Sequence, residues 1–440
     1  MISMTYPSGQ VIDYNYGDSG SVNDVISRLD NMVGNSDATG GGTVTLESYQ
    51  YLGLGTLVQR VQNQANMELT YIGSTAGGDG GDIYTGLDRF GRVLGEKWLN
   101  ASGNGVDIMS YTYDADGNVT EEDYPLAIVV PASHSFLDET FTYNDLNQLT
   151  GVSHFTGFST ANNQTFTMSA AGAITDITTG GIAQNRTVNS ENQITAIGSS
   201  SISYDNNGNV TTDDNGQTLV FDAWNRLVEV KASNGTIIAG YTYDGLGRMT
   251  SETNVTTTTD MYYAGGQEVE ERTGVTDYTG ASLSSNGTTT LVNVFSPNGG
   301  NILTRDSGGT RVYFSHDVIG DVTGVISTAG VVLQRQSYSA YGNVTFLAAN
   351  FSSTTDGYNL VYLWQNGDRS RITQMYKFGY RWYTPSLQWL SFDPSGYPDG
   401  MDAYIPMADN PINRTDPKGL RTVLISIIVD KASKPGNFNV

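Results

Sequence analysis

The chain has 440 residues, a formal net charge of −23 and a calculated pI near 4.3. It contains no cysteine, which excludes disulfides and cysteine-based zinc sites, and its three histidines are too scattered for a histidine cluster. The acidity argues against DNA or RNA as a partner, because nucleic-acid binders gain affinity by neutralising phosphates with Lys and Arg.

The first residues already have the character of the repeats described below. Residues 1–14 lack the basic-then-apolar pattern of a signal peptide, and they alternate aromatic and polar residues around a Pro-Ser-Gly turn. We therefore expect the chain to begin inside an array, with an exposed strand edge open to self-association. No apolar stretch approaches the ~20 residues needed to span a bilayer.

One short phrase recurs through the middle of the chain. Residues 111–120, 203–211 and 241–250 each place Tyr before Asp, then Gly three residues later, then Val or Met. Alternating aromatic and β-branched residues predict half-buried strands, and Asp-x-x-Gly predicts a tight turn between them. We expect each Tyr to bury its ring while its hydroxyl reaches water or a backbone carbonyl. Looser copies begin at Phe141, Val220 and Tyr338.

Other segments interrupt this pattern. The Gly-rich runs at 39–42 and 77–81 and the Ser/Thr/Gly-rich segment 273–301 predict long hairpin loops. Helical patterns are weak, so residues 21–30 and 360–369 are expected to form short helices at most. Asp114 and Asp116 before Gly117 resemble a calcium loop, but Pro125 stands where a bidentate Glu belongs, so we expect a plain turn.

The C-terminal part carries two Asp-Pro-x-Gly motifs, Asp393 to Gly396 and Asp416 to Gly419, the second followed by Leu420. Arg381-Trp-Tyr precedes them. With the Tyr-Asp phrases, these motifs make most of the chain resemble the Rhs/YD-repeat family, ending in an Rhs repeat-associated core. The resemblance implies an all-β fold: a spiral of hairpins forming a shell or partial shell over residues 1–375, a core plug over 376–420 and a short tail over 421–440.

The resemblance also implies a function. In the family, such shells enclose a passenger polypeptide, and the paired aspartates are associated with self-cleavage after the Leu of the second motif. Carried over, Asp393 and Asp416 form the acid/base pair, Arg381 lowers the pKa of one aspartate, and the scissile bond is Leu420–Arg421. Two carboxylates held close share a proton, so one acts as base and the other as acid.

One departure from the family concerns the residues before Trp389. The family usually has Gly-Arg before this aromatic residue, whereas this chain reads Leu387-Gln388-Trp389. If the missing arginine positions an aspartate, its loss would disable cleavage. The only enzymatic activity that the sequence suggests is therefore this aspartyl-type self-cleavage.

The tail is too short to fold alone, because even ~40 residues usually need disulfides or metals. Residues 422–429 are strongly β-prone and apolar, and we expect them to be buried in the shell or against its wall. The expected partner is thus the chain's own C-terminal segment or a passenger. No metal, redox cofactor or nucleotide is indicated.

Two other classes of function fit the composition. A secreted or cell-surface adhesion protein that binds carbohydrate would expose coplanar aromatic rings such as Trp224 or Trp389. A filament-forming repeat protein would self-associate through strand edges. The shell and the carbohydrate binder differ in whether the aromatic residues are buried. Secretion or a cell-surface location is expected in either case.

Overall fold

The structure is a computed structural model that describes residues 3–38, 40–71, 86–127, 135–155, 160–276 and 285–424. The predicted loop at 77–81 and most of the predicted tail strand lie outside these residues. In the part of the tail strand that is described, Val423 and Leu424 are exposed rather than buried as expected. None of the described helices is long and apolar enough to cross a membrane.

The wall of the molecule consists of two antiparallel sheets of 16 and 14 strands. In each sheet, every described strand pairs with its neighbours in sequence, so the chain runs as a continuous meander. The first sheet contains β1 (Ser3–Thr5), β2 (Val11–Asn15), β3 (Asn31–Asn35), β4 (Thr43–Leu52), β5 (Thr56–Gln62), β6 (Met67–Thr70), β7 (Gly95–Asn100), β8 (Gly105–Tyr113), β9 (Val119–Asp123), β10 (Glu139–Tyr143), β11 (Leu149–His154), β12 (Gln164–Met168), β13 (Ile174–Thr179), β14 (Ile182–Val188), β15 (Ile194–Ile197) and β16 (Ser200–Ser201).

The second sheet continues the wall with the same pairing pattern. Its strands are β17 (Ser203–Tyr204), β18 (Val210–Thr212), β19 (Thr218–Phe221), β20 (Leu227–Lys231), β21 (Ile237–Tyr243), β22 (Met249–Thr253), β23 (Thr258–Ala264), β24 (Gln267–Thr276), β25 (Ser285–Phe295), β26 (Ile302–Ser307), β27 (Thr310–His316), β28 (Val322–Ser327), β29 (Val332–Tyr338) and β30 (Val344–Ala348). The all-β class is therefore confirmed.

The Tyr-Asp phrase links three consecutive hairpins. Asp244 caps its own turn, with its Oδ1 accepting two backbone N–H groups at 2.9 Å each. The Tyr243 hydroxyl donates to the Leu227 carbonyl of the preceding hairpin at 2.6 Å. Arg248 pairs with Asp244 and donates to the Gly265 carbonyl of the following hairpin at 2.8 Å. One repeat thus fixes its own turn and both neighbours.

The tyrosine part of this arrangement recurs along the wall. At four further repeats, a tyrosine hydroxyl also donates to a backbone carbonyl of the preceding hairpin. This confirms the expectation that the hydroxyl of a repeat tyrosine can reach a backbone carbonyl. The pairs are Tyr113 with Val93 at 2.7 Å, Tyr143 with Val119 at 2.6 Å, Tyr204 with Ile194 at 3.1 Å and Tyr338 with Val322 at 2.8 Å.

Replacing Tyr243 with phenylalanine tests this arrangement. The hydroxyl donates to Leu227 and accepts from Trp382 Nε1 at 3.0 Å, so its removal leaves a buried donor and acceptor unpaired. We expect Tyr243→Phe to lower the free energy of unfolding in urea by about 1–3 kcal/mol. The matched control is Tyr380→Phe, since Tyr380 is 51% exposed and its hydroxyl has no partner within the described residues. Equal stability of the two variants would contradict this role.

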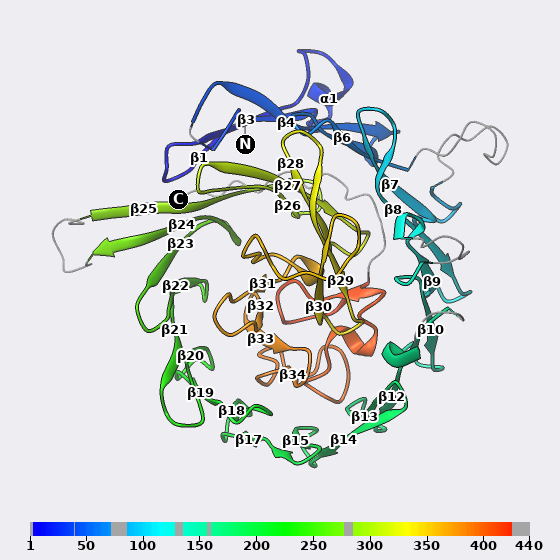
Figure 1. Cartoon of the computed structure of the whole chain (residues 1–440), viewed down its shortest axis with the longest axis vertical. Helices are drawn as coiled ribbons and strands as arrows, with labels where there is room; N and C mark the ends of the chain where they lie inside the picture. The colour runs from blue at the N-terminus through cyan, green and yellow to red at the C-terminus, as the bar shows by residue number, and fades with distance from the viewer. Residues whose placement is uncertain are drawn as a thin grey trace.

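The wall closes on itself by overlap. Figure 1 shows the strands running around a ring, with β26–β28 lying inside β3, β4 and β7. Trp98 Nε1 donates to the His316 carbonyl at 2.8 Å, and Gln62 Nε2 donates to the Phe314 carbonyl at 2.7 Å. The predicted spiral therefore makes a closed turn rather than a partial shell. A shared core joins Ile12, Met32, Leu46 and Trp98 with Val294, Leu303, Tyr313 and Ile326.

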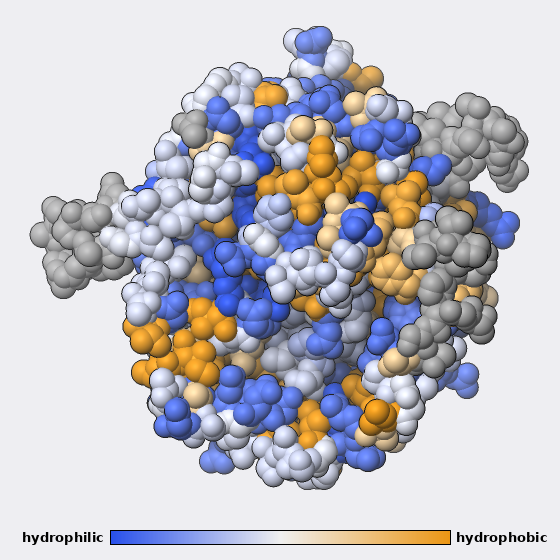
Figure 2. Space-filling view, viewed as in Figure 1, coloured by the Kyte–Doolittle hydropathy of each residue, from blue (hydrophilic) through white to orange (hydrophobic). Residues whose placement is uncertain are grey.

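A plug formed by residues 360–424 occupies the centre of the ring (Figure 1). It contains a four-stranded sheet, a two-stranded sheet and two 3₁₀ turns, and it packs its aromatic residues against both wall sheets. In the space-filling view from the same side, atoms of the chain cover the centre of the ring (Figure 2). The elements are β31 (Asp368–Arg369), β32 (Tyr376–Phe378), β33 (Arg381–Thr384), β34 (Gln388–Trp389), β35 (Arg414–Thr415), β36 (Val423–Leu424), η4 (Trp364–Asn366) and η5 (Met407–Asp409).

The plug is hydrogen-bonded to the hairpin turns that form one end of the wall. These contacts come from its loops and reach both sheets. They join Asn410 Nδ2 to the Asn147 carbonyl at 2.7 Å, Val119 N to Asn413 Oδ1 at 2.7 Å, the Tyr404 hydroxyl to the Gly208 carbonyl at 2.8 Å, and Val210 N to the Leu390 carbonyl at 2.9 Å.

The prediction of a loop over 273–301 was wrong. Strand β24 continues to Thr276 and β25 begins at Ser285, so most of this segment forms a long hairpin that projects from the wall (Figure 1). The Ser/Thr content suggested a loop, but β-branched threonine fits a pleated sheet well. The only described helices are short: α1 (Val22–Val25), η2 (Pro125–Ala127), η3 (Thr160–Asn162), η4 and η5.

Candidate functional site

The plug brings the three predicted site residues together around one guanidinium. Arg381 begins β33, and its side chain is 1% exposed. Its Nη2 lies 2.8 Å from Asp393 Oδ2 and 3.2 Å from Asp416 Oδ2. Both carboxylate side chains are at least 97% buried. A single buried cation therefore bridges the two aspartates, which are 23 residues apart in sequence.

The other two guanidinium nitrogens of Arg381 also donate hydrogen bonds. Nε donates to the Gly419 carbonyl at 2.5 Å, and Nη1 donates to the Ala403 carbonyl at 2.9 Å. The guanidinium stacks over the Trp389 ring, 4.0 Å from its centroid. This planar, forked group suits several acceptors at once, whereas a lysine ammonium does not match the geometry.

Each Asp-Pro-x-Gly motif forms a turn that presents its aspartate. The Gly396 and Gly419 amides donate back to the Asp393 and Asp416 carbonyls at 2.9 and 3.1 Å. Gly419 has φ +63°, and a Cβ on it would lie 2.6 Å from the Phe378 carbonyl oxygen. Only glycine fits this position, because the backbone is left-handed and the turn packs directly against the backbone of β32.

The predicted scissile bond lies directly over Asp416. Asp416 Oδ1 accepts hydrogen bonds from the amides of Leu420 at 3.0 Å and Arg421 at 3.1 Å. The nitrogen that would leave in hydrolysis is therefore within hydrogen-bond distance of one aspartate, whose other oxygen is paired with Arg381.

The electrostatics of the site favour the neutral form of one carboxyl, Asp393. Burial raises the pKa of Asp393, the nearby Asp416 charge raises it further, and Arg381 and the Ser395 amide oppose the shift. Arg381 was expected to lower the pKa of one aspartate, and its effect on the pKa of Asp393 has that sign but does not outweigh burial. Two ionised carboxylates with one guanidinium would leave a net negative charge in a buried site, which favours protonation of one carboxyl.

Gln388 alone stands between Leu387 and Trp389, where the family usually has Gly-Arg. Gln388 is buried with φ +67°, a conformation in which glycine is usual. An arginine from this position is not needed to contact the aspartates in this structure, because Arg381 reaches both.

Sequence reasoning missed one acidic residue of the site, Asp399. Its carboxylate accepts hydrogen bonds from the backbone and hydroxyl of Thr422, just past the predicted scissile bond. The only signal was an Asp-Gly pair between the two motifs, which is also an ordinary turn signal.

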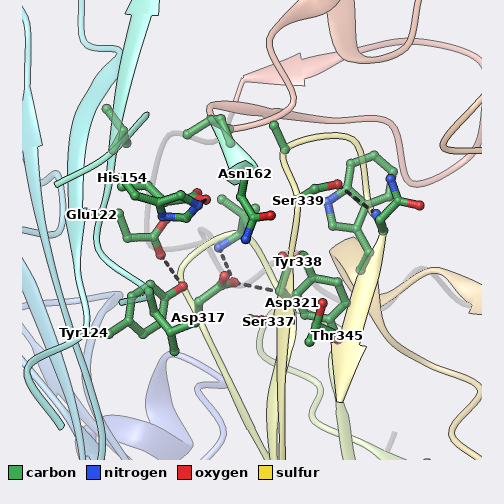
Figure 3. Close-up of a pocket in the computed structure, with 18 of the residues that line it drawn as sticks. Glu122, Tyr124, His154, Asn162, Asp317, Asp321, Ser337, Tyr338, Ser339 and Thr345 are labelled. Carbon is green, nitrogen blue, oxygen red and sulfur yellow. Dashed lines mark hydrogen bonds and ion pairs between the residues drawn. The ribbon is translucent and has the colours of Figure 1, made fainter. Parts of the chain in front are cut away.

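A partly open cavity of about 330 Å³ lies between the two wall sheets, with plug residues Trp364 and Ile412 at its edge. Figure 3 shows Glu122, His154 and Asp317 around it, from β9, β11 and the turn before β28. The Tyr124 hydroxyl donates to Glu122 Oε1 at 2.8 Å, while His154 Nε2 lies 3.7 Å from Glu139 Oε1.

Burial controls the ionisation of this cavity. It raises the pKa of Glu122 to about 7 and that of Glu139 to about 8, and it also raises the pKa values of Asp317 and Asp321. Burial lowers the pKa of His154. The cavity therefore holds carboxyl groups that are largely neutral in mild acid.

Asp114 forms the predicted turn, with the Gly117 amide donating to its carbonyl at 3.2 Å. Asp114 Oδ1 accepts from Asn118 N at 2.8 Å and Oδ2 from Asn118 Nδ2 at 2.9 Å, so the carboxylate is used within its own turn. Within the described part of the chain, no group of three His, Cys, Asp or Glu side chains is arranged to hold a metal ion.

One protein-family model matches most of this chain. The model of the teneurin YD-shell matches residues 86–411, most of both wall sheets and the plug. The chain belongs to the teneurin YD-shell family. Family membership and the closed wall together confirm the predicted YD-repeat shell, whereas the match does not identify the C-terminal core as a separate domain.

Similar proteins come from several bacteria. The tRNA3(Ser)-specific nuclease WapA of Bacillus spizizenii is 28% identical over 293 residues, which are 63% of this chain and 12% of that protein. The toxin subunit YenC2 of Yersinia entomophaga is 30% identical over 112 residues, 25% of this chain and 11% of that protein. This YD-shell chain thus spans only about a tenth of the length of these curated relatives.

Solved structures share the fold over nearly the whole chain. A TcdB2-TccC3 structure superposes with a TM-score of 0.72 at 20% identity, covering 95% of this chain and 21% of that one. A Photorhabdus luminescens Tc holotoxin pore gives a TM-score of 0.73 at 20% identity, covering 96% of this chain and 21% of that one. At this identity, the likeness shows the fold alone.

Proposed function

We propose that this YD-shell chain is the closing end of a shell that holds a C-terminal polypeptide and cuts the chain after Leu420. The observation that carries the proposal is the position of the Leu420–Arg421 bond. The backbone amides of Leu420 and Arg421 both donate to Asp416. Arg381 forms ion pairs with both Asp416 and Asp393 inside the plug.

The chemistry proposed is hydrolysis by a carboxyl pair. A water molecule attacks the Leu420 carbonyl carbon, one carboxylate accepts a proton from the water, and the other carboxyl, protonated, acts as the acid. Asp416, which already accepts a hydrogen bond from the Arg421 amide, takes the proton from the water and passes it to the departing amine, while Asp393, whose pKa is raised by burial, is the protonated carboxyl that donates to the Leu420 carbonyl oxygen. The water oxygen remains on Leu420 as a carboxylate. Arg381 holds both aspartates in place and limits their mutual repulsion.

Enclosure is supported by the closed wall and by the way the plug is held. The wall overlaps itself, and residues 360–424 fill its centre with contacts to the turns of both sheets. We retain the proposed division into wall (1–375), core (376–420) and tail (421–440), noting that the plug sheet already begins with β31 at Asp368. The proposed partner is the chain's own C-terminal segment, and the toxin subunits and Tc holotoxin among the similar proteins support a secreted setting.

The aromatic residues favour the shell over a carbohydrate-binding surface. Trp389 is 1% exposed beneath Arg381, whereas Trp224 is 75% exposed at a turn and stacks with Arg226. The two tryptophans therefore do not form a shared face for a sugar. Tyr111 and Tyr241 are buried in the wall, as a shell requires.

Intact mass measurement of purified variants under denaturing conditions tests the proposal. We expect Asp393→Asn and Asp416→Asn to remain uncut, or to cut at least about a hundredfold more slowly, because each loses one member of the acid/base pair. The matched control is Asp116→Asn, which makes the same change at an exposed turn. Cleavage of all three variants at the wild-type rate would overturn the assignment.

A further inference from the structure

Asp399 binds the residue two positions beyond the proposed scissile bond. Its Oδ1 and Oδ2 lie 3.1 and 2.9 Å from Thr422 N, and Oδ2 accepts from the Thr422 hydroxyl at 2.7 Å. Hydrogen bonds to an ionised carboxylate are stronger than neutral ones. This carboxylate therefore holds both the backbone and the side chain of Thr422.

A second contact holds the same segment. Strand β36 pairs with β35, with Val423 opposite Thr415 and Leu424 opposite Arg414. Val423 is 52% exposed and Leu424 is 62% exposed, so apolar burial contributes little to holding this segment. The hydrogen bonds that Thr422 donates to Asp399, together with the pairing of β36 with β35, fix residues 422–424 to the plug.

We propose that Asp399 and β35 form a clasp that keeps the segment after Leu420 bound to the shell once the bond is cut, and that this clasp selects a hydroxyl-bearing residue at position 422. The proposal rests on the proposed cleavage. It makes Asp399 a positioning residue, because it acts on the chain beside the bond and not on the reacting atoms.

The location of the clasp explains why hydrolysis leaves it intact. Asp399, Arg414 and Thr415 precede the bond, whereas Thr422 and β36 follow it, so every contact of the clasp joins the two products. Cutting adds one more attraction, because the new α-amino group of Arg421 is protonated near neutral pH and lies beside Asp416. The cut segment is therefore held by an ion pair, hydrogen bonds to Asp399 and a strand pairing.

The hydroxyl of Thr422 gives the clasp its specificity. Valine has the same shape as threonine without the donor, so Thr422→Val leaves one oxygen of Asp399 without this partner. Serine retains the donor, so Thr422→Ser is expected to preserve the clasp. This pair of variants separates recognition of the hydroxyl from simple packing.

Hydrogen–deuterium exchange of the full chain tests the clasp whether or not the bond is cut. In Asp399→Asn, one carboxylate oxygen is replaced by an amide donor facing another donor, and we expect the Thr422 amide to exchange at least about tenfold faster. Thr422→Val should show the same direction, whereas Thr422→Ser and the control Asp116→Asn should match wild type. An unchanged Thr422 amide in Asp399→Asn would overturn the clasp.

Retention of the cut segment is the second measurement. After cleavage, gel filtration of wild type should show residues 421–440 eluting with the shell, and the rate of their loss should rise at least about tenfold in Asp399→Asn and Thr422→Val. Equal retention in all variants overturns the clasp. An uncut wild-type chain counts against the cleavage proposal, and in that case the exchange measurement alone decides whether the clasp exists.

Discussion

Replacing Arg381 with methionine is expected to lower the free energy of unfolding by about 3–5 kcal/mol, the largest effect of any single substitution considered. Methionine approximates the volume but leaves Asp393 and Asp416 buried together without a cation. It also leaves the Gly419 and Ala403 carbonyls without their donors. Urea unfolding followed by tryptophan fluorescence measures the loss, because Trp389 lies against the guanidinium.

Two further variants make this result specific. Arg381→Lys keeps the charge but lacks the planar fork that serves four acceptors, so we expect it to recover less than half of the lost stability. Arg89→Met removes an arginine from an exposed turn and should change stability by less than about 0.5 kcal/mol. A loss below about 1 kcal/mol for Arg381→Met would contradict the view that this cation holds the plug together.

Stability is expected to fall as pH rises from 5 to 9. The folded-state pKa values of about 7 for Glu122 and about 8 for Glu139 lie above the unfolded value near 4.3. A raised folded pKa contributes stability that is fully present below the unfolded pKa and is lost as pH rises through the folded pKa. The other titratable groups at the cavity, Asp317, Asp321 and His154, are also shifted by burial toward their neutral forms.

Glu139→Gln isolates one of these groups. Glutamine keeps the shape but has no charge to bury, so at pH 9 we expect this variant to be more stable than wild type by about 3 kcal/mol, and at pH 5 to be nearly equal. The matched control is Glu191→Gln at an exposed turn, which should follow the wild-type curve. Unfolding in urea at each pH provides the comparison. Wild-type stability that rises between pH 5 and 9 would contradict the neutral state of the cavity.

Much of the wall was predictable because its interactions are local. The Tyr-Asp phrase specifies strand, turn and strand within about ten residues, and repetition of a unit that cannot bury its own faces requires stacking. The contact of Tyr243 with the preceding hairpin and of Arg248 with the following one follows the same short period.

Closure of the wall was not predictable, because it depends on residues far apart in sequence. Nothing local in the sequence pairs Trp98 with His316, which lie 218 residues apart. The long hairpin of β24 and β25 was missed for a different reason: its Ser and Thr residues suit both a loop and a pleated strand, and only the pairing of the two strands distinguishes these.

The candidate site was also predictable only in part. The family resemblance located Arg381, Asp393 and Asp416, and the structure places them in contact. The role of Asp399 was not predictable from the sequence, because its contact with Thr422 forms only when the plug folds. The acidic cavity was also missed, since Glu122, Glu139 and Asp317 come from separate repeats.

The most direct test of the account is the mass of the wild-type protein, taken from a single gel-filtration peak and measured under denaturing conditions. We predict two species in that peak, one ending at Leu420 and one beginning at Arg421, because the bond is cut and the segment stays bound. A single species with the mass of all 440 residues would contradict cleavage by Asp393 and Asp416.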